Sequence, residues 1–332
     1  MKTQTPVVTT VTGDISPDRL GFCQCHEHLL IAPGRSGEID SALCFHDVAR
    51  SADEVMLYQS AGGSALVDAQ PVGCGRMASG LLQIAQQTGV TLIASTGFHK
   101  MLFYPENHWI FSVSLPRLTE LFLHELNTGM YVDADDRLPG SWIPARAGII
   151  KTALDSCGLT SQYRKLFYAA AAASRETDAP IMIHVEKASN PLELLDFLTH
   201  LGVEPCRLIF CHMDRACPDL SVHLALCSTG SYLEYDTIGR FKYHDDQQEI
   251  RFFQMLKEHG MLSRLLFSLD TTKLRFQAYS GPKAVGLTYI LRVFIPLLKK
   301  AGFSSEEIRS ISTDNPRAVL TRHSNFSKGE PI

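Results

Sequence analysis

Two histidines, His26 and His28, stand two residues apart inside an apolar run near the N-terminus. A β-strand directs every second side chain to the same face. If this run is a strand, both imidazoles can bind one cation, while Cys23, Cys25 and Glu27 point the other way. A single His-x-His pair is weak evidence in a chain with 13 histidines, so other parts of the chain must supply further ligands.

Further residues that could take part in metal chemistry stand within or at the ends of other apolar runs: Lys151, His184, His212 and Asp270. Alone, each has an ordinary structural explanation, because a terminal histidine can hydrogen-bond a loop and a terminal aspartate can cap the next helix. Together, four histidines and one aspartate are enough for two divalent metals if another group bridges them. The sequence therefore predicts a two-metal site if the fold brings these positions together.

Short β-type runs alternate with longer helical patterns along the chain, which favours βα units and a parallel sheet. The β-type runs cover residues 20–28, 64–70, 91–97, 147–151, 180–185, 207–212, 231–236 and 265–270. The helical patterns cover residues 77–88, 115–127, 162–177, 191–201, 219–227, 247–260 and 285–300, with short helices at 304–310 and 315–320. This order predicts an α/β protein.

The eight β-type runs match the number of strands that closes a (β/α)8 TIM barrel, whose active site lies at the C-terminal ends of the strands. We therefore predict such a barrel, with a binuclear metal centre at its C-terminal mouth. One domain is expected over residues 1–332, with a lead-in at 1–18 and short helices and a tail at 303–332. An open doubly wound sheet is the alternative, although no G-x-G-x-x-G motif follows the first run.

The composition describes an ordinary globular protein, because 45% of the residues are hydrophobic and 20% are charged. A formal net charge of −4 with mixed signs argues against nucleic-acid binding, which needs a concentrated basic face. The N-terminus has no long apolar core and no run reaches about 18 apolar residues, so neither secretion nor a membrane span is expected. The nine cysteines form no C-x-x-C pair, and free thiols are typical of a cytoplasmic protein.

Lys151 is the unusual member of the candidate set, because an ammonium group repels metal cations. It follows the apolar run Ala147-Gly148-Ile149-Ile150, so its burial is expected. A buried amine loses its proton more readily than an exposed one, and a neutral amine can add carbon dioxide. The product, a carbamate, is an anion whose two oxygens can bridge two metal ions.

A series of short motifs stands in a fixed order along the predicted strands. They are Leu20-Gly21 with His26-Glu27-His28-Leu29, Val67-Asp68 with Gly75-Arg76, Thr96-Gly97-Phe98, Ala147-Gly148-Ile149-Ile150-Lys151, Ala179-Pro180-Ile181 with His184 and Glu186, Cys211-His212-Met213-Asp214-Arg215, Tyr235-Asp236 with Gly239-Arg240, and Asn315-Pro316-Arg317. This combination resembles the phosphotriesterase family of the amidohydrolase superfamily over nearly the whole chain. Two motifs depart from the family pattern, because Cys23 replaces a usual threonine, and Cys211 and Met213 replace Gly and Leu of G-H-L-D-R.

The resemblance implies a role for each candidate ligand. The more buried of two divalent metal ions would be held by His26, His28 and Asp270. The more exposed ion would be held by His184 and His212. Carboxylated Lys151 would bridge both ions, which are expected to be zinc, with manganese or cobalt as alternatives. Two such metals supply hydroxide from a shared water for hydrolysis, and Asp270 would take its proton and pass it to the leaving oxygen.

Specificity in such barrels lies in the loops that follow the strands. The loops after the third, seventh and eighth predicted strands offer candidate substrate-binding residues: Phe98, His99, Tyr104, Arg240, Lys242, Tyr243, Lys273 and Arg275. Several cations at one mouth favour an anionic substrate, because arginine and lysine bind phosphate well. A family branch that opens phosphorylated sugar lactones has similar motifs: Gly239-Arg240-Phe241-Lys242-Tyr243 and Asp270-Thr271-Thr272-Lys273.

We therefore expect a lactonase or carboxylesterase for a small anionic substrate that resembles a phosphorylated sugar lactone. Two alternatives stay open. The first is hydrolysis of a phosphotriester, another phosphoester or an N-acyl amide. The second is a barrel that binds a ligand without catalysis, although the complete ligand set argues against it. No nucleic-acid or membrane partner is expected, and the family resemblance suggests a homodimer.

Overall fold

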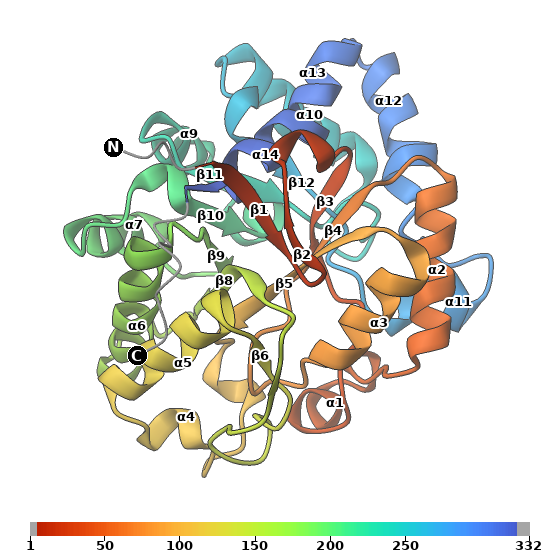
Figure 1. The fold of residues 1–332 in the computed structure, drawn as a ribbon. Helices are drawn as coiled ribbons and strands as arrows, with labels where there is room; N and C mark the ends of the chain where they lie inside the picture. The colour runs from red at the N-terminus through yellow and green to blue at the C-terminus, as the bar shows by residue number, and fades with distance from the viewer. Residues whose placement is uncertain (1–4, 324–332) are drawn as a thin grey trace.

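The computed structural model describes residues 5–323, and eight parallel strands form a nearly closed barrel at its centre (Figure 1). Neighbouring strands follow the order β12-β11-β10-β9-β8-β5-β4-β3. Their bounds in chain order are β3 Cys23–Glu27, β4 Ala65–Asp68, β5 Thr91–Gly97, β8 Ala147–Leu154, β9 Ile181–Val185, β10 Leu208–Cys211, β11 Tyr232–Tyr235 and β12 Leu265–Phe267. The predicted α/β fold, a (β/α)8 TIM barrel, is confirmed.

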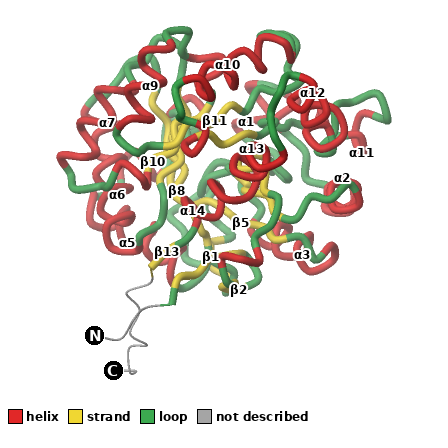
Figure 2. Tube along the Cα trace, turned by 90° about the horizontal axis from the view of Figure 1, so that it is seen from above, coloured by secondary structure: helices red, strands yellow, loops and turns green. Residues whose placement is uncertain are grey.

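Helices lie outside the strands and surround the barrel (Figure 2). The longer ones are α2 Val48–Ser60, α3 Ala78–Thr88, α5 Leu115–Asn127, α6 Ser161–Thr177, α7 Pro191–His200, α9 Leu220–Ser228 and α10 Asp246–Glu258. The shorter ones are α1 Arg35–Ile39, α4 Trp109–Ser112, α8 Met213–Ala216, α11 Gln277–Ser280, α12 Ile295–Lys300, α13 Ser305–Arg309 and α14 Asn315–Leu320. The helix predicted at 285–300 is shorter than expected, and a π-helical stretch, η7 (Ile290–Phe294), leads into α12.

Strand side chains pack into two separate apolar clusters, one inside the barrel and one between the strands and the helices. Val67, Ile93 and Ile149 belong to the interior cluster. Leu66, one position before Val67, belongs to the outer cluster. Lys151 follows Ile149 by two residues on β8, so its side chain also enters the barrel interior.

The register of β3 corrects one prediction about the first histidines. β3 pairs with β4 through a register shift between Gln24 and Glu27, a β-bulge that changes the face to which later side chains point. Cys23 and Cys25 pack in the interior cluster, and His26, the next residue, also reaches the interior. The prediction that the two cysteines point away from His26 is wrong, because strict alternation holds only in a regular strand.

The first and last strands meet at a seam where side chains replace part of the backbone ladder. The Ser268 hydroxyl accepts from the His26 amide at 2.9 Å and donates to the buried Glu27 carboxylate at 2.7 Å. The same carboxylate accepts from the Thr271 amide at 3.1 Å. The Asp270 amide donates to the His26 carbonyl at 3.0 Å. These contacts fix the segment that carries Asp270 beside β3.

A small sheet covers the opposite end of the barrel. It consists of β1 (Pro6–Thr10), β2 (Gly13–Ile15) and β13 (Arg322–His323), which lie inside the ring of helices in Figure 1 and at the bottom of Figure 2. Gly148 is needed here, because a Cβ at this position would lie 2.3 Å from the Thr9 carbonyl oxygen. The predicted lead-in at 1–18 therefore contains a hairpin that covers the barrel.

Two strands, β8 and β12, end three residues away from the predicted positions. β8 continues to Leu154 because residues 152–154 are as buried as the run before them, so Lys151 lies within the strand and not at its end. β12 ends at Phe267, and Asp270 lies in the loop that follows, with a φ of 48°. Since the seam holds this loop against β3, the aspartate still reaches the mouth of the barrel.

Two broader expectations concern the whole chain. Within residues 5–323, no helix is both long and apolar enough to cross a membrane. One domain over residues 1–332 stays a prediction. Its first four residues and the part of the predicted tail at 324–332 lie outside the described residues.

Candidate metal centre and active site

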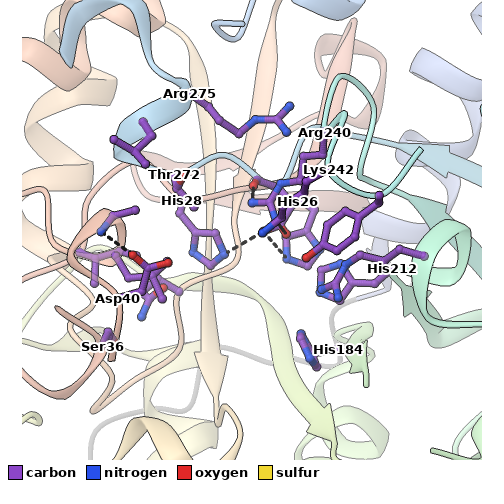
Figure 3. Close-up of a pocket in the computed structure, with 18 of the residues that line it drawn as sticks. His26, His28, Ser36, Asp40, His184, His212, Arg240, Lys242, Thr272 and Arg275 are labelled. Carbon is purple, nitrogen blue, oxygen red and sulfur yellow. Dashed lines mark hydrogen bonds and ion pairs between the residues drawn. The ribbon is translucent and has the colours of Figure 1, made fainter. Parts of the chain in front are cut away.

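A cavity of about 550 Å³ opens at the C-terminal mouth of the barrel. It is lined by five of the predicted metal ligands: His26, His28, His184, His212 and Asp270. The sixth, Lys151, is fully buried beside it, with its Nζ 3.0 Å from His26 Nε2. Figure 3 shows His28 between Asp40 on one side and Arg240 on the other, with His26, His184 and His212 on the same side of Asp40. The fold therefore brings the whole predicted ligand set to one place.

Hydrogen bonds fix the orientation of His26. Its Nδ1 lies 3.2 Å from Glu234 Oε2 and 3.3 Å from Asp236 Oδ2, and both carboxylates are fully buried. Acceptors on that side hold the ring proton on Nδ1, so the Nε2 lone pair faces Lys151. Burial and the positive charge of Lys151 lower the pKa of His26 to about 4. The ring is therefore neutral near pH 7, as a metal ligand must be.

Carboxylates also hold the two histidines of the opposite strands. His212 Nδ1 lies 2.6 Å from Asp236 Oδ1, and its amide donates to Oδ2 of the same carboxylate at 3.0 Å. His184 Nε2 lies 3.4 Å from Glu186 Oε2, and the centroids of the two imidazole rings are 4.5 Å apart. Burial lowers the pKa of His184 to about 3 and the pKa of His212 well below its usual value. Both rings are therefore neutral and oriented.

Asp270 lies between the first two histidines and an arginine. Its Oδ1 is 3.5 Å from His28 Nε2 and 4.0 Å from His26 Nε2, while its Oδ2 is 3.1 Å from Arg240 Nη1. Burial by itself raises the pKa of this carboxyl, but the Arg240 guanidinium and the hydrogen bond with His28 bring the pKa well below its usual value. Asp270 is therefore an ionised carboxylate with one oxygen on the histidine side.

The donor set fits divalent metal ions. Ligand atoms of a tetrahedral zinc site lie about 2.0–2.2 Å from the metal and hence roughly 3.3 Å from one another. The distances from Asp270 Oδ1 to His28 Nε2 and His26 Nε2, 3.5 and 4.0 Å, are close to that spacing. Nearby, Glu234 Oε1 is buried and has no hydrogen-bond partner within residues 5–323. Buried negative charge without a partner is costly, and metal cations at the histidines would offset this cost.

Comparison with known proteins supplies the family. The sequence profile of the phosphotriesterase family matches residues 6–320, which is most of the chain. The chain belongs to the phosphotriesterase family. This family consists of binuclear metal enzymes that act as hydrolases, and the described residues contain groups that can bind metals, among them His26, His28 and Asp270. The chain is therefore a hydrolase of this family.

Several relatives and solved structures match at nearly full length. A phospho-furanose lactonase of Mycoplasmopsis synoviae is 29% identical over 319 residues, or 94% of this chain and 90% of the relative. The human N-acetyltaurine hydrolase is 26% identical over 355 residues, or 95% of this chain and 97% of the relative. The lactonase Lmo2620 from Listeria monocytogenes gives a TM-score of 0.85 at 27% identity, over 95% of this chain and 98% of that chain. The Escherichia coli phosphotriesterase homology protein, described with phosphate in its active site, gives a TM-score of 0.81 at 27% identity, over 91% and 99%.

The structure brings some of the predicted substrate-binding residues to the cavity and leaves others outside it. Five of the predicted substrate-binding residues line the cavity of this family member: His99, Arg240, Lys242, Tyr243 and Arg275. Phe98, Tyr104 and Lys273 do not line it. Phe98 is fully buried, with its ring centroid 5.2 Å from that of Phe167, because the first residue after β5 still packs on the helices. Tyr104 is also buried, and its hydroxyl accepts from the His99 amide at 2.9 Å.

Other residues of the site were not predicted. Arg215 and Glu186 line the cavity; both stand in the family motifs next to a ligand, but no role was assigned to them. Glu234 and Asp236 could have been found, because two acids at alternate positions of a buried strand must face one interior. Asp40 carries no such signal, because it lies in an irregular loop whose path the sequence does not reveal.

Proposed function

We propose that this protein is a binuclear metal-dependent lactonase or carboxylesterase for a small anionic substrate that resembles a phosphorylated sugar lactone. The observation that carries the proposal is the positive charge of one wall of the cavity. Arg215, Arg240, Lys242 and Arg275 line this wall. The Nε atoms of the three arginines are buried and have no hydrogen-bond partner within residues 5–323. Guanidinium groups with free donors bind phosphate and carboxylate strongly.

The proposed metal ligands are the six residues predicted from the sequence. One ion would be held by His26, His28 and Asp270, and the other by His184 and His212. Carboxylated Lys151 would bridge both, with zinc as the expected metal and manganese or cobalt as alternatives. Burial supports the carboxylation, because the only hydrogen-bond partner of Lys151 Nζ among residues 5–323 is His26 Nε2. A charged ammonium group with a single hydrogen-bond partner is unfavourable in a fully buried position.

The residues around the metals support ester or lactone hydrolysis. Bound metals would supply an activated water and polarise the scissile carbonyl group. Asp270 would take the proton of the attacking water and deliver it to the leaving oxygen. Arg240, 3.1 Å from Asp270 Oδ2, keeps this carboxylate ionised before the reaction. Glu234 and Asp236 keep His26 and His212 in the orientation that the ligands need.

The relatives support an anionic substrate. The names phospho-furanose lactonase and N-acetyltaurine hydrolase both denote small molecules that carry a strong acid group. The Escherichia coli relative is described with phosphate in its active site. Hydrolysis of an N-acyl amide is a second candidate for this chain, because N-acetyltaurine hydrolases match over 95% of its length.

A panel of four substrates tests the proposal. It consists of a phosphorylated sugar lactone, the same lactone without phosphate, N-acetyltaurine and an aryl phosphotriester, each assayed with zinc-loaded enzyme. We expect the highest kcat/KM for the phosphorylated lactone, with the neutral lactone about 10- to 100-fold lower because charged hydrogen bonds are lost. Faster turnover of N-acetyltaurine would favour the second candidate. Equal turnover of both lactones would contradict an anion-binding wall.

Two further proposals concern the protein as a whole. We propose a homodimer, which light scattering would report as twice the chain mass of 36.8 kDa. We also propose a cytoplasmic location, supported by the nine cysteines, all of which are free thiols in the structure. Cell fractionation would test the location.

A further inference from the structure

The wall of the cavity opposite the arginines has a different chemical character. Ser36, from the short helix α1, Asp40, directly after that helix, and Gln70, from the loop after β4, line it. In Figure 3, Ser36 and Asp40 lie on one side of His28, and Arg240, Lys242 and Arg275 lie on the other. We call Ser36, Asp40 and Gln70 the acceptor wall. The reacting centre of a bound substrate must therefore lie between an acidic and a basic wall.

Asp40 is held in place but keeps one oxygen free. Its Oδ1 accepts from the Ala42 amide at 2.9 Å and so caps the short helix η2 (Ser41–Leu43). The second carboxylate oxygen makes no hydrogen bond, and the side chain makes no ion pair, with any residue of 5–323. Because the first oxygen fixes the side chain, the second is a preoriented acceptor at the cavity.

The two neighbours of Asp40 add further hydrogen-bonding capacity. Ser36 is buried, and its hydroxyl has only the Cys74 sulfur at 3.7 Å as a partner in the described chain. A thiol is a weak hydrogen-bonding group, so this hydroxyl is free to bind a ligand. The side-chain nitrogen of Gln70, Nε2, donates to the Cys74 carbonyl oxygen, which leaves the side-chain oxygen of Gln70 as an acceptor.

We infer that the acceptor wall binds hydroxyl groups of the substrate and that Asp40 selects polyhydroxylated, sugar-derived substrates over simple acyl compounds. A carboxylate and an amide oxygen repel a phosphate and accept hydrogen bonds from hydroxyl donors. The opposite wall does the reverse. A substrate with an anionic group at one end and hydroxyls at the other is therefore bound in one orientation, with its carbonyl at the histidines. This inference rests on the proposed lactone hydrolysis and adds the identity of the second recognition group.

Two matched substrates and three variants test the role of Asp40. The substrates are a phosphorylated five-membered sugar lactone and the same phosphorylated lactone without ring hydroxyls. Asp40→Ala removes the acceptor, whereas Asp40→Asn keeps an oxygen for the cap on η2 and removes only the charge. Glu38→Gln is the control, because Glu38 lies on α1 two residues before Asp40, pairs with Arg35 at 3.1 Å and does not line the cavity.

We expect the wild type to prefer the hydroxylated lactone and Asp40→Ala to lower its kcat/KM by about 10- to 100-fold, the size of one hydrogen bond to a charged group. Asp40→Asn should lie between Asp40→Ala and the wild type. The lactone without hydroxyls should change by less than about threefold in any variant, since it makes no contact that Asp40 could lose. Metal content should be the same in all variants. Asp40→Ala should lower the melting temperature slightly because it loses the cap on η2, whereas Asp40→Asn keeps an oxygen for that cap.

Two other results overturn the inference in different ways. If Asp40→Ala lowers kcat/KM equally for both lactones, or leaves both unchanged, Asp40 does not recognise hydroxyl groups, although the proposed lactonase activity stands. If the wild type hydrolyses neither phosphorylated lactone, the proposed function itself fails and the inference falls with it.

Discussion

The floor and the rim of the cavity are held in different ways. The floor, made of the six proposed metal ligands, has no residue more than 8% exposed, and buried carboxylates orient His26 and His212. The rim, formed by the loops that follow the strands, is more exposed. Phe241 and Leu274, in the loops after β11 and β12, are 61% and 66% exposed. A floor built on strands and on the residues directly after them keeps catalytic geometry fixed, while loops can change with the substrate. We therefore expect the floor to determine the reaction and the rim to determine the substrate.

Loss of the bridging group at the floor should have the largest effect. Lys151→Ala removes the proposed carbamate, so we expect a fall in kcat of about 1,000-fold or more, because several kcal/mol of metal-derived stabilisation would be lost. Lys187→Ala, at an exposed lysine that does not line the cavity, is the matched control and should leave kcat unchanged. A Lys151→Ala enzyme within tenfold of the wild type would mean that the floor does not carry the reaction.

Loss of the proposed proton acceptor, Asp270, should have the next largest effect. Asp270→Asn keeps the shape of the side chain but lowers its basicity, and general base catalysis is worth about 100- to 10,000-fold. We expect a loss of kcat in that range for every substrate, measured with metal-saturated enzyme. Asp196→Asn, whose side chain is 74% exposed, serves as the control. A loss confined to anionic substrates would assign Asp270 to substrate binding and not to proton transfer.

At the rim, a charge change should act on binding and not on chemistry. Lys242→Ala and Arg275→Ala should raise KM for the phosphorylated lactone by about 10- to 100-fold each and leave a neutral ester within threefold, because only the anion loses a charged hydrogen bond. Lys273→Ala is the matched control, since Lys273 lies in the same loop as Arg275 but does not line the cavity. Equal effects on neutral and anionic substrates would refute the separation of floor and rim.

The smallest effect on activity is expected for Phe98, an aromatic residue that is buried in the core and does not line the cavity. Phe98→Ala should lower the free energy of unfolding by about 3–5 kcal/mol, because a fully buried ring is removed from the core, while KM stays the same. Phe103→Ala, at a residue that lines the cavity beside His99 with ring centroids 4.3 Å apart, should change KM and affect stability less. Denaturation and steady-state kinetics on both variants measure the contrast, and the opposite pattern would place Phe98 in the site.

The comparison also explains what the sequence could predict. The proposed ligands could be selected from the sequence because histidine, lysine and aspartate are rare in apolar strands, and parallel strands place their carboxyl ends together. The faces of Cys23 and Cys25 were not, because the bulge between Gln24 and Glu27 breaks the alternation. The extra strands of the small sheet at the closed end, β1, β2 and β13, join chain ends that no local pattern connects.

The sequence does not show which residues of the rim line the cavity, for a related reason. Phe98 and His99 are neighbours, yet one packs into the core and the other lines the cavity. Asp40 is 30 residues before Gln70 in the chain and joins it on one wall only because both loops rise from neighbouring strands. Loop paths depend on tertiary contacts, such as the Asp40 cap on the Ala42 amide, that residue type alone does not specify.

The metal content of the protein tests the two-metal floor most directly. The protein is stripped of metal, reloaded with zinc in the presence of bicarbonate, freed of loosely bound ions, and its zinc is counted per chain by elemental mass spectrometry. We predict two zinc ions per wild-type chain and fewer than two in Lys151→Ala, where the proposed bridge is missing. A wild-type protein that retains one ion or none, with full activity towards the phosphorylated lactone, would contradict the proposed binuclear centre.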